Sequence, residues 1–198
     1  PGQALPAFLD RTLPNDYPDG FAKRGGLLFV GRLAPPPECE GGAWVGPEVF
    51  PKIRAELPEV KFFVVGFKVT EEIKALAQPD NGIVIKGFVS EEELKELYSA
   101  CKLVVVPLRY GAGVKGKVVE AIYHGAPIVT TSTGAEGIPF VESVLEIADE
   151  PEAFADRVAE LYNDNGRCQE LCRRTQDYIK KNFSMDGAWK VIDEDFRV

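Results

Sequence analysis

Residues 111–125 read GAGVKGKVVEAIYHG and follow the strongly apolar run KLVVVPLRY. Two glycines precede two lysines, Lys115 and Lys117, and a carboxylate follows at Glu120. Glycines and cations at a turn from strand to helix are typical of anion binding, because the backbone there approaches a ligand closely. A carboxylate one helical turn further is suited to accept hydrogen bonds from hydroxyl groups.

The spacing favours a nucleotide diphosphate as the anion. If a helix begins near Val114, its positive end faces whatever lies over Gly111 and Gly113. Lys117 and Glu120 are three residues apart, so they share one side of that helix. Lys117 and the backbone would then meet the diphosphate. Glu120 would accept two hydrogen bonds from vicinal hydroxyls such as those of a ribose.

A second cation for the diphosphate is expected from Arg32 or Arg109, each of which follows an apolar run. The alternative interpretation is an ordinary surface pair between Lys117 and Glu120. Such a pair stabilises a helix by only about 0.2–0.5 kcal/mol.

These residues need a framework that places them at strand ends. SEEELKELYSA has a clear helix start, with Ser90 as N-cap and Glu93 three residues later. Apolar runs at 26–33, 61–67, 82–88, 102–108, 126–131 and 143–148 alternate with helical patterns near 44–56, 70–77, 90–100 and 115–124, and further helices are expected at 151–162, 167–182 and 185–196. The alternation predicts an α/β fold, a doubly wound parallel sheet of about six strands flanked by helices.

Ligands of doubly wound sheets lie outside the carboxyl ends of the strands, so the strand-end loops carry the functional information. The four loops read VGRLAPPP, KGFVS, PLRYGAGVKGKVVEA and TTSTGAEGI. In the first, Gly31 permits close approach of the backbone, and Arg32 supplies a cation with forked donors. The third loop is the most specific of the four.

Composition excludes several classes of protein. A net charge of -8 argues against nucleic acid as a partner. No apolar run approaches the length of a membrane span, and no signal peptide is expected because the first residues lack an apolar core. The four cysteines are expected to be reduced structural thiols of a cytoplasmic protein, because Cys168 and Cys172 have no further ligands to complete a zinc site.

The chain divides into three segments. Residues 1–25 are rich in Pro, Gly and Asp and read as a linker or covering segment from a preceding half. Residues 26–182 form the α/β domain, and residues 183–198 form a C-terminal helix. Because the sequence does not start with Met, we expect it to be part of a longer protein.

Residues 26–182, and most specifically 107–137, resemble the carboxyl-terminal half of retaining glycosyltransferases of the group 1 (family 4) type. The resemblance implies a GT-B fold, in which two Rossmann-like halves enclose the active site. It implies that this chain is the half that binds the nucleotide-sugar donor. The amino-terminal, acceptor-binding half would then be missing, and any peripheral membrane association would occur only through that half.

The resemblance also implies roles for individual residues. Glu120 matches the glutamate that holds the donor ribose, and Lys117 matches the lysine beside the diphosphate. Gly31 and Arg32 match a further phosphate contact. The remaining expected donor contacts are the turn Phe88–Val89, which would bracket the base through its backbone, and Arg109, Gly111, Gly113 and Val114.

Two departures from the family pattern concern the sugar and the phosphates. Ala112 lies eight residues before Glu120, where members often carry a first glutamate that contacts the donor sugar. No lysine follows Gly31–Arg32 closely. The family needs no metal, so no cofactor is expected, and the acidic triplet Asp193–Asp195 is interpreted as solvated charge.

The sequence therefore predicts donor binding for glycosyl transfer from a nucleotide-diphosphate sugar. The leading alternative is a non-catalytic nucleotide-sugar-binding or interaction module of a larger polysaccharide-assembly protein. A weaker one is a nucleotide-sugar epimerase. A second Rossmann-like half upstream of Pro1 would favour the transferase.

Overall fold

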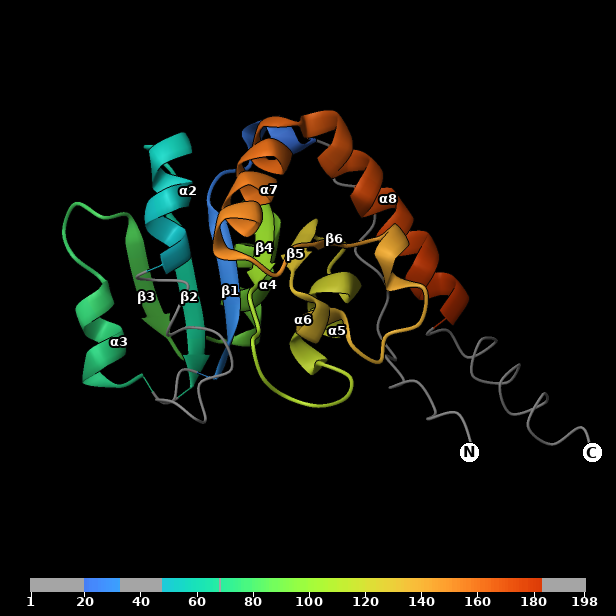
Figure 1. Ribbon diagram of the computed structural model, residues 1–198, viewed down its shortest axis with the longest axis horizontal. Coiled ribbons are helices and arrows are strands. Elements are labelled where there is room, and N and C mark those ends of the chain that lie inside the picture. The colour runs from blue at the N-terminus through green and yellow to red at the C-terminus, as the bar shows by residue number, and fades with distance from the viewer. Residues whose placement is uncertain (1–19, 33–47, 68, 183–198) are drawn as a thin grey trace, which may run out of the picture.

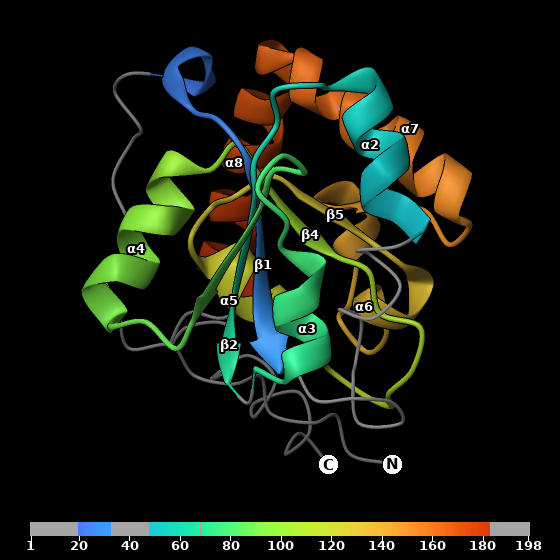
Figure 2. The same ribbon diagram turned by 90° about the vertical axis from the view of Figure 1, so that its left-hand side faces the viewer.

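The computed structural model describes residues 20–32, 48–67 and 69–182. Six parallel strands form one sheet in the order β3-β2-β1-β4-β5-β6. Their bounds are β1 Leu27–Arg32, β2 Phe62–Phe67, β3 Ile83–Gly87, β4 Leu103–Val106, β5 Ile128–Thr130 and β6 Glu146–Ile147. Helices flank the sheet on both faces (Figures 1 and 2). The expected doubly wound, Rossmann-like parallel sheet is confirmed.

Alternating side chains of each central strand supply two separate cores. Leu27 and Phe29 of β1 belong to one buried cluster, whereas Leu28 belongs to the other. β4 divides in the same way, with Leu103 on one face and Val104 on the other. Because successive side chains of a strand point to opposite faces, a strand covered on both sides must be apolar throughout.

The helices divide between the two cores. The first cluster includes residues of α2 (Phe50–Glu56) and α7 (Pro151–Asn163), and α3 (Glu71–Leu76) packs against it; the second includes α4 (Glu91–Ala100) and α5 (Gly116–Tyr123). α8 (Asn165–Asn182) contributes Leu171 to the first cluster and Ile179 to the second, so it spans the edge between the two. Figure 2 separates the two layers, with α4 on one side of the sheet and α2 on the other.

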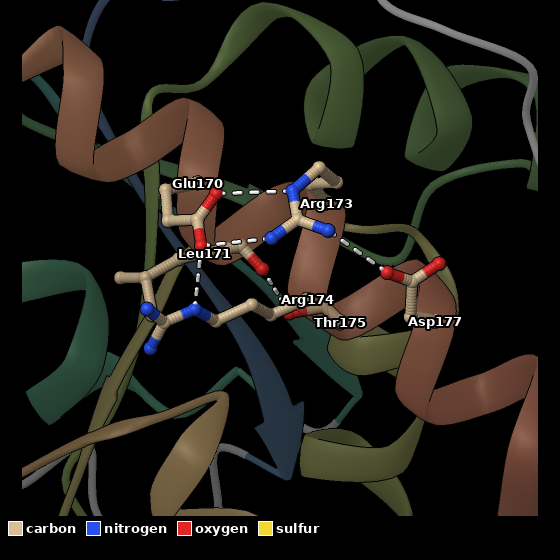
Figure 3. Close-up of polar contacts among 6 residues, drawn as sticks. All are labelled: Glu170, Leu171, Arg173, Arg174, Thr175 and Asp177. Atoms are coloured by element: carbon tan, nitrogen blue, oxygen red, sulfur yellow. Dashed lines mark hydrogen bonds and ion pairs between the residues drawn. The ribbon is translucent and has the colours of Figure 1, made fainter.

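The solvent face of α8 carries a chain of ion pairs (Figure 3). The Glu170 carboxylate accepts hydrogen bonds from Arg173 and Arg174, and Arg173 also reaches Asp177 at 3.1 Å. These hydrogen bonds lower the pKa of Glu170 to about 2. The pairs follow the i, i+3 and i, i+4 spacings that bring helical side chains together.

Local signals place several helix ends correctly. Ser90 caps α4, its Oγ accepting from the Glu93 N–H at 3.2 Å, which confirms the predicted start. The Glu93 carboxylate forms an ion pair with Lys86, with 3.0 Å between Oε1 and Nζ. α5 begins at Gly116, two residues later than Val114, because Lys115 has extended backbone angles. It ends before Gly125, whose φ of 64° is suited to glycine.

Other boundaries differ from the expectations. β6 has two residues, and β5 has three. A short helix, α6 (Ser132–Ala135), and the 3-10 turns η1 (Phe21–Lys23) and η3 (Val141–Ser143) lack the periodic pattern that predicts longer helices. The helix expected at 185–196 and most of the segment 1–25 lie outside the described residues.

The strand order places the switch point between β1 and β4, from which the chain winds in opposite directions. Their ladder pairs Leu27 with Leu103 and Leu28 with Val104, and the later residues of β1 pair with β2. Gly31 and Arg32 of the first predicted loop lie at the end of β1, and β4 leads into PLRYGAGVKGKVVEA. The fold therefore places Gly31 and Arg32 on the strand next to the one that leads into the third loop, and residues 33–37 of the first loop lie outside the described residues.

Candidate functional site

The β4–α5 loop leaves the core abruptly. Leu108 is fully buried, whereas residues 109–114 are exposed. Gly111 and Gly113 have φ values of 116° and 72°, which side-chain-bearing residues adopt only with strain. Figure 1 shows the loop at the edge of the sheet to which the arrows of β1 and β2 point. Both glycines are therefore needed for this exposed backbone path.

Lys115 turns back into the loop. Its side chain is 6% exposed, and its Nζ donates to the Gly111 carbonyl at 3.1 Å and the Gly113 carbonyl at 2.5 Å. A third contact, at 3.3 Å, reaches the Glu136 carboxylate. The sequence grouped Lys115 with Lys117 as a cation at the helix start, but the two ammonium groups lie in different surroundings.

Lys117 reaches across the switch point towards β1. A Cβ atom built on Gly31 would lie 3.2 Å from the Lys117 Nζ and 2.8 Å from Cζ of Phe29. The same Nζ lies 5.8 Å from the centroid of the Phe29 ring. Gly31 therefore leaves the space that the ammonium group occupies, and the structure brings these two predicted site residues together. The backbone of Arg32 follows at the end of β1, in register with Phe67.

Glu120 lies one turn further along α5 and is partly exposed. Burial, and secondarily the nearby Glu120 carboxylate, raise the pKa of Tyr98 well above its ordinary value. Tyr98 is 1% exposed and stacks on His124 with ring centroids 4.1 Å apart. Tyr98 of α4 therefore lies close both to the end of α5 and to the Glu120 carboxylate.

Arg109 is engaged with a carboxylate. Its Nη2 lies 3.4 Å from Glu48, just before α2, and the Arg109 side chain is 38% exposed. The pair connects the segment that follows β1 with the loop that follows β4. Sequence reasoning missed Glu48, because nothing local signals a contact between residues 61 positions apart.

The predicted base contact lies at the end of β3. Gly87 has a φ of 69°, and Phe88 after it is 84% exposed. Among the described residues, four of the five exposed large hydrophobic side chains lie at this edge of the sheet: Phe67 ends β2, Phe88 follows β3, and Tyr110 and Val114 belong to the β4–α5 loop. For Phe67 and Phe88, the sequence signal is an aromatic residue at the end of an apolar run.

The described residues hold no cluster of metal ligands and no membrane-spanning helix. There, no three His, Cys, Asp or Glu residues lie together as a metal site would need. Asp193–Asp195 fall outside the described residues. Within the same residues, no helix has both the length and the apolar content to cross a membrane.

The fold and the loops define a Rossmann-type α/β domain whose switch point carries a glycine turn and a lysine. Residues 24–164 match the family described as "Glycosyl transferases group 1", and the chain belongs to that family. It is 28% identical over 194 residues to an uncharacterized 44.6 kDa protein in the cps region of Klebsiella pneumoniae. That alignment covers 95% of this chain and 50% of the relative, so the chain spans about half the relative's length.

Solved structures share the fold at low identity. A variant of S. aureus TarM, in complex with fondaparinux, alpha-GlcNAc-glycerol and UDP, superposes with a TM-score of 0.73 at 16% identity over 96% of this chain and 38% of that one. Anabaena Alr3699/HepE, in complex with UDP and glucose, gives a TM-score of 0.66 at 19% identity. That match covers 90% of this chain and 49% of the HepE chain. Sucrose-phosphate synthase of Thermosynechococcus elongatus gives a TM-score of 0.64 at 18% identity. That match covers 88% of this chain and 45% of the synthase chain.

Proposed function

We propose that this chain is the donor-binding half of a retaining glycosyltransferase that uses a nucleotide-diphosphate sugar. The observation that carries the proposal is the Lys117 ammonium group at Gly31, with Glu120 one turn further along the same helix. Membership of the group 1 family supports glycosyl transfer as the reaction class. The TarM and HepE structures were solved with UDP, which supports a nucleotide donor.

In the proposed complex, the donor diphosphate lies over the glycines of the β4–α5 loop. Lys117, Arg32 and the positive end of α5 stabilise the negative charge that builds on the departing diphosphate. Arg109 supplies further positive charge from the loop. No metal is assigned a role.

The rest of the donor is held at two further places. Glu120 accepts hydrogen bonds from the ribose hydroxyls. The backbone at Phe88–Val89 contacts the base. Because Ala112 replaces the first glutamate of the family pattern, sugar recognition falls to other groups, including backbone donors at Gly113 and Val114.

The acceptor site is assigned to a second, amino-terminal half of the full-length protein. The exposed hydrophobic side chains at the strand ends are suited to be covered by a ligand or by such a half. The 198-residue chain alone is expected to bind the donor weakly and to transfer no sugar.

A titration tests the proposal. We expect the chain to bind UDP, or another nucleoside diphosphate in a panel of bases, and to do so equally in the presence of a chelator. Lys117→Met should weaken diphosphate binding about tenfold or more and leave nucleoside binding nearly unchanged, because the lysine meets phosphate alone. Lys95→Met, on the exposed face of α4, is the matched control. Equal affinity of wild type and Lys117→Met for the diphosphate would refute the site, and a requirement for added Mg²⁺ or Mn²⁺ would refute the metal-independent mechanism.

A further inference from the structure

The TTSTGAEGI loop has no part in the proposed donor contacts, yet it is fastened to the end of β4. Thr130 Oγ1 donates to the Val106 carbonyl at 2.7 Å, and Thr131 Oγ1 donates to the Leu108 carbonyl. Thr131 Oγ1 also accepts from the Gly134 N–H at 3.1 Å, at the start of α6. Two hydrogen bonds therefore tie this loop to the strand that leads into the glycine turn.

The residues after α6 support that turn directly. A Cβ on Gly137 would lie 3.2 Å from Cγ2 and 3.3 Å from the backbone N of Val114, and the φ of Gly137 is 75°. Glu136, beside it, binds the Lys115 ammonium group. The Glu136–Gly137 turn therefore packs against the exposed loop and places a carboxylate close to it.

Lys115 has no donor left for a ligand. A lysine ammonium group has three N–H donors, and here three acceptors, the Gly111 and Gly113 carbonyls and the Glu136 carboxylate, lie within 2.5–3.3 Å of Nζ. Its side chain is also 6% exposed, whereas Lys117 is only partly buried. The neighbouring lysines are thus distinguished by geometry.

We propose that Lys115 and Glu136 are positioning residues of the donor site. Lys115 fixes the carbonyls of both loop glycines and neutralises Glu136, whose charge would otherwise oppose a bound diphosphate. The inference rests on the proposed function for the identity of the ligand. The fixing of the loop itself is a property of the free protein.

Backbone dynamics in the absence of nucleotide test the fixing of the loop. We expect ¹⁵N order parameters of about 0.85 for residues 111–114 in wild type and below about 0.6 in Lys115→Met. Lys117→Met, the matched control, should leave them unchanged. Glu136→Gln removes the charge of one of the three partners of Lys115. It should therefore lower the order parameters less than Lys115→Met does, and it should keep the fold. It is the decisive variant if Lys115→Met does not fold. Unchanged order parameters in a folded Lys115→Met variant overturn the proposal. If that variant does not fold, unchanged order parameters in Glu136→Gln overturn it.

UDP binding tests the neutralisation of charge. Lys115→Met should weaken UDP binding about tenfold, and adding Glu136→Gln should recover part of that loss, because the unpaired carboxylate is then gone. The order parameters of the double variant should stay low. Lost UDP affinity with an unchanged loop and no recovery would make Lys115 a direct ligand and overturn the proposal. If wild type binds no UDP or other nucleoside diphosphate, the proposed function fails, and the order parameters still decide the role of Lys115.

Discussion

Lys115 and Lys117 lie two residues apart, and their ammonium groups have different surroundings. Lys117 extends across the sheet to Gly31, whereas Lys115 curls into its own loop. Lys115 is in the extended N-cap position and Lys117 is inside α5, so their side chains leave the backbone in different directions. At the scale of the residue, backbone conformation separates two chemically identical groups.

Glu120→Gln tests the ribose contact. A hydrogen bond to a charged group contributes about 1.5–3 kcal/mol and a neutral one less, so UDP and uridine should both bind about tenfold more weakly. Glu96→Gln, on the exposed side of α4, should change neither affinity. Calorimetric titration of both ligands, beside melting curves, measures this. Unchanged affinity in Glu120→Gln would support the alternative interpretation, in which Lys117 and Glu120 form an ordinary surface pair.

Gly31→Ala tests the approach of α5 to β1. The new methyl group would lie 2.8 Å from the Phe29 ring and 3.2 Å from the Lys117 Nζ, so both must move. Overpacking of this kind costs about 1–3 kcal/mol of unfolding free energy, and the displaced lysine should weaken UDP binding. Gly25→Ala, whose Cβ would meet only the Tyr162 hydroxyl at 3.8 Å, is the control. Full UDP affinity in Gly31→Ala would show that the position of Lys117 is not needed.

At the scale of the element, helix caps and turns set the direction in which the loops leave the sheet. The Ser90 cap starts α4 immediately after the Phe88–Val89 turn, so the direction of that turn depends on where the helix begins. Tyr98, two turns later, stacks on His124 at the end of α5. The same helix therefore connects the predicted base contact with the helix that carries Glu120.

Ser90→Ala should lower the free energy of unfolding by about 1 kcal/mol, because the Glu93 N–H loses its acceptor. Ser99→Ala is the control within the same helix, since its Oγ bonds only the Lys95 carbonyl and Ala is the better helix former. Urea unfolding of both variants gives the comparison. Equal destabilisation by the two substitutions would mean that the cap contributes nothing specific.

At the scale of the whole molecule, the two cores bury ionisable groups in neutral form. Burial raises the pKa of Cys101 from 9.0 to about 12 and that of Cys168 from 9.0 to about 11. Burial, with a smaller effect of Glu142, raises the pKa of Tyr178 to about 12, and its hydroxyl donates to the Pro139 carbonyl at 2.7 Å. The folded state therefore favours the protonated, neutral form of these three groups.

Stability should therefore fall as the pH rises above about 9. Below that pH, both the folded and the unfolded thiols keep their protons, so the contribution is complete. Between about 9 and 12, the unfolded chain releases the Cys101 proton and the folded chain retains it. Cys101→Ala should reduce the slope of unfolding free energy against pH by up to about 1.4 kcal/mol per pH unit. Urea titrations at pH 8, 9.5 and 10.5 measure the slopes, and parallel slopes would contradict the prediction.

The class of fold was predictable from the sequence, because apolar runs, periodic helices, the Ser90 cap and the glycine turns depend on residues close together in the chain. The sequence also indicated the loop that carries Lys117 and Glu120, since strands of this kind end at one edge of the sheet. The contacts between distant groups were not predictable from the sequence. The Lys115–Glu136 and Arg109–Glu48 pairs join segments 21 and 61 residues apart, and Lys117 reaches Gly31 on another strand. Such contacts depend on the distances between packed elements, and residue types and spacing do not contain those distances.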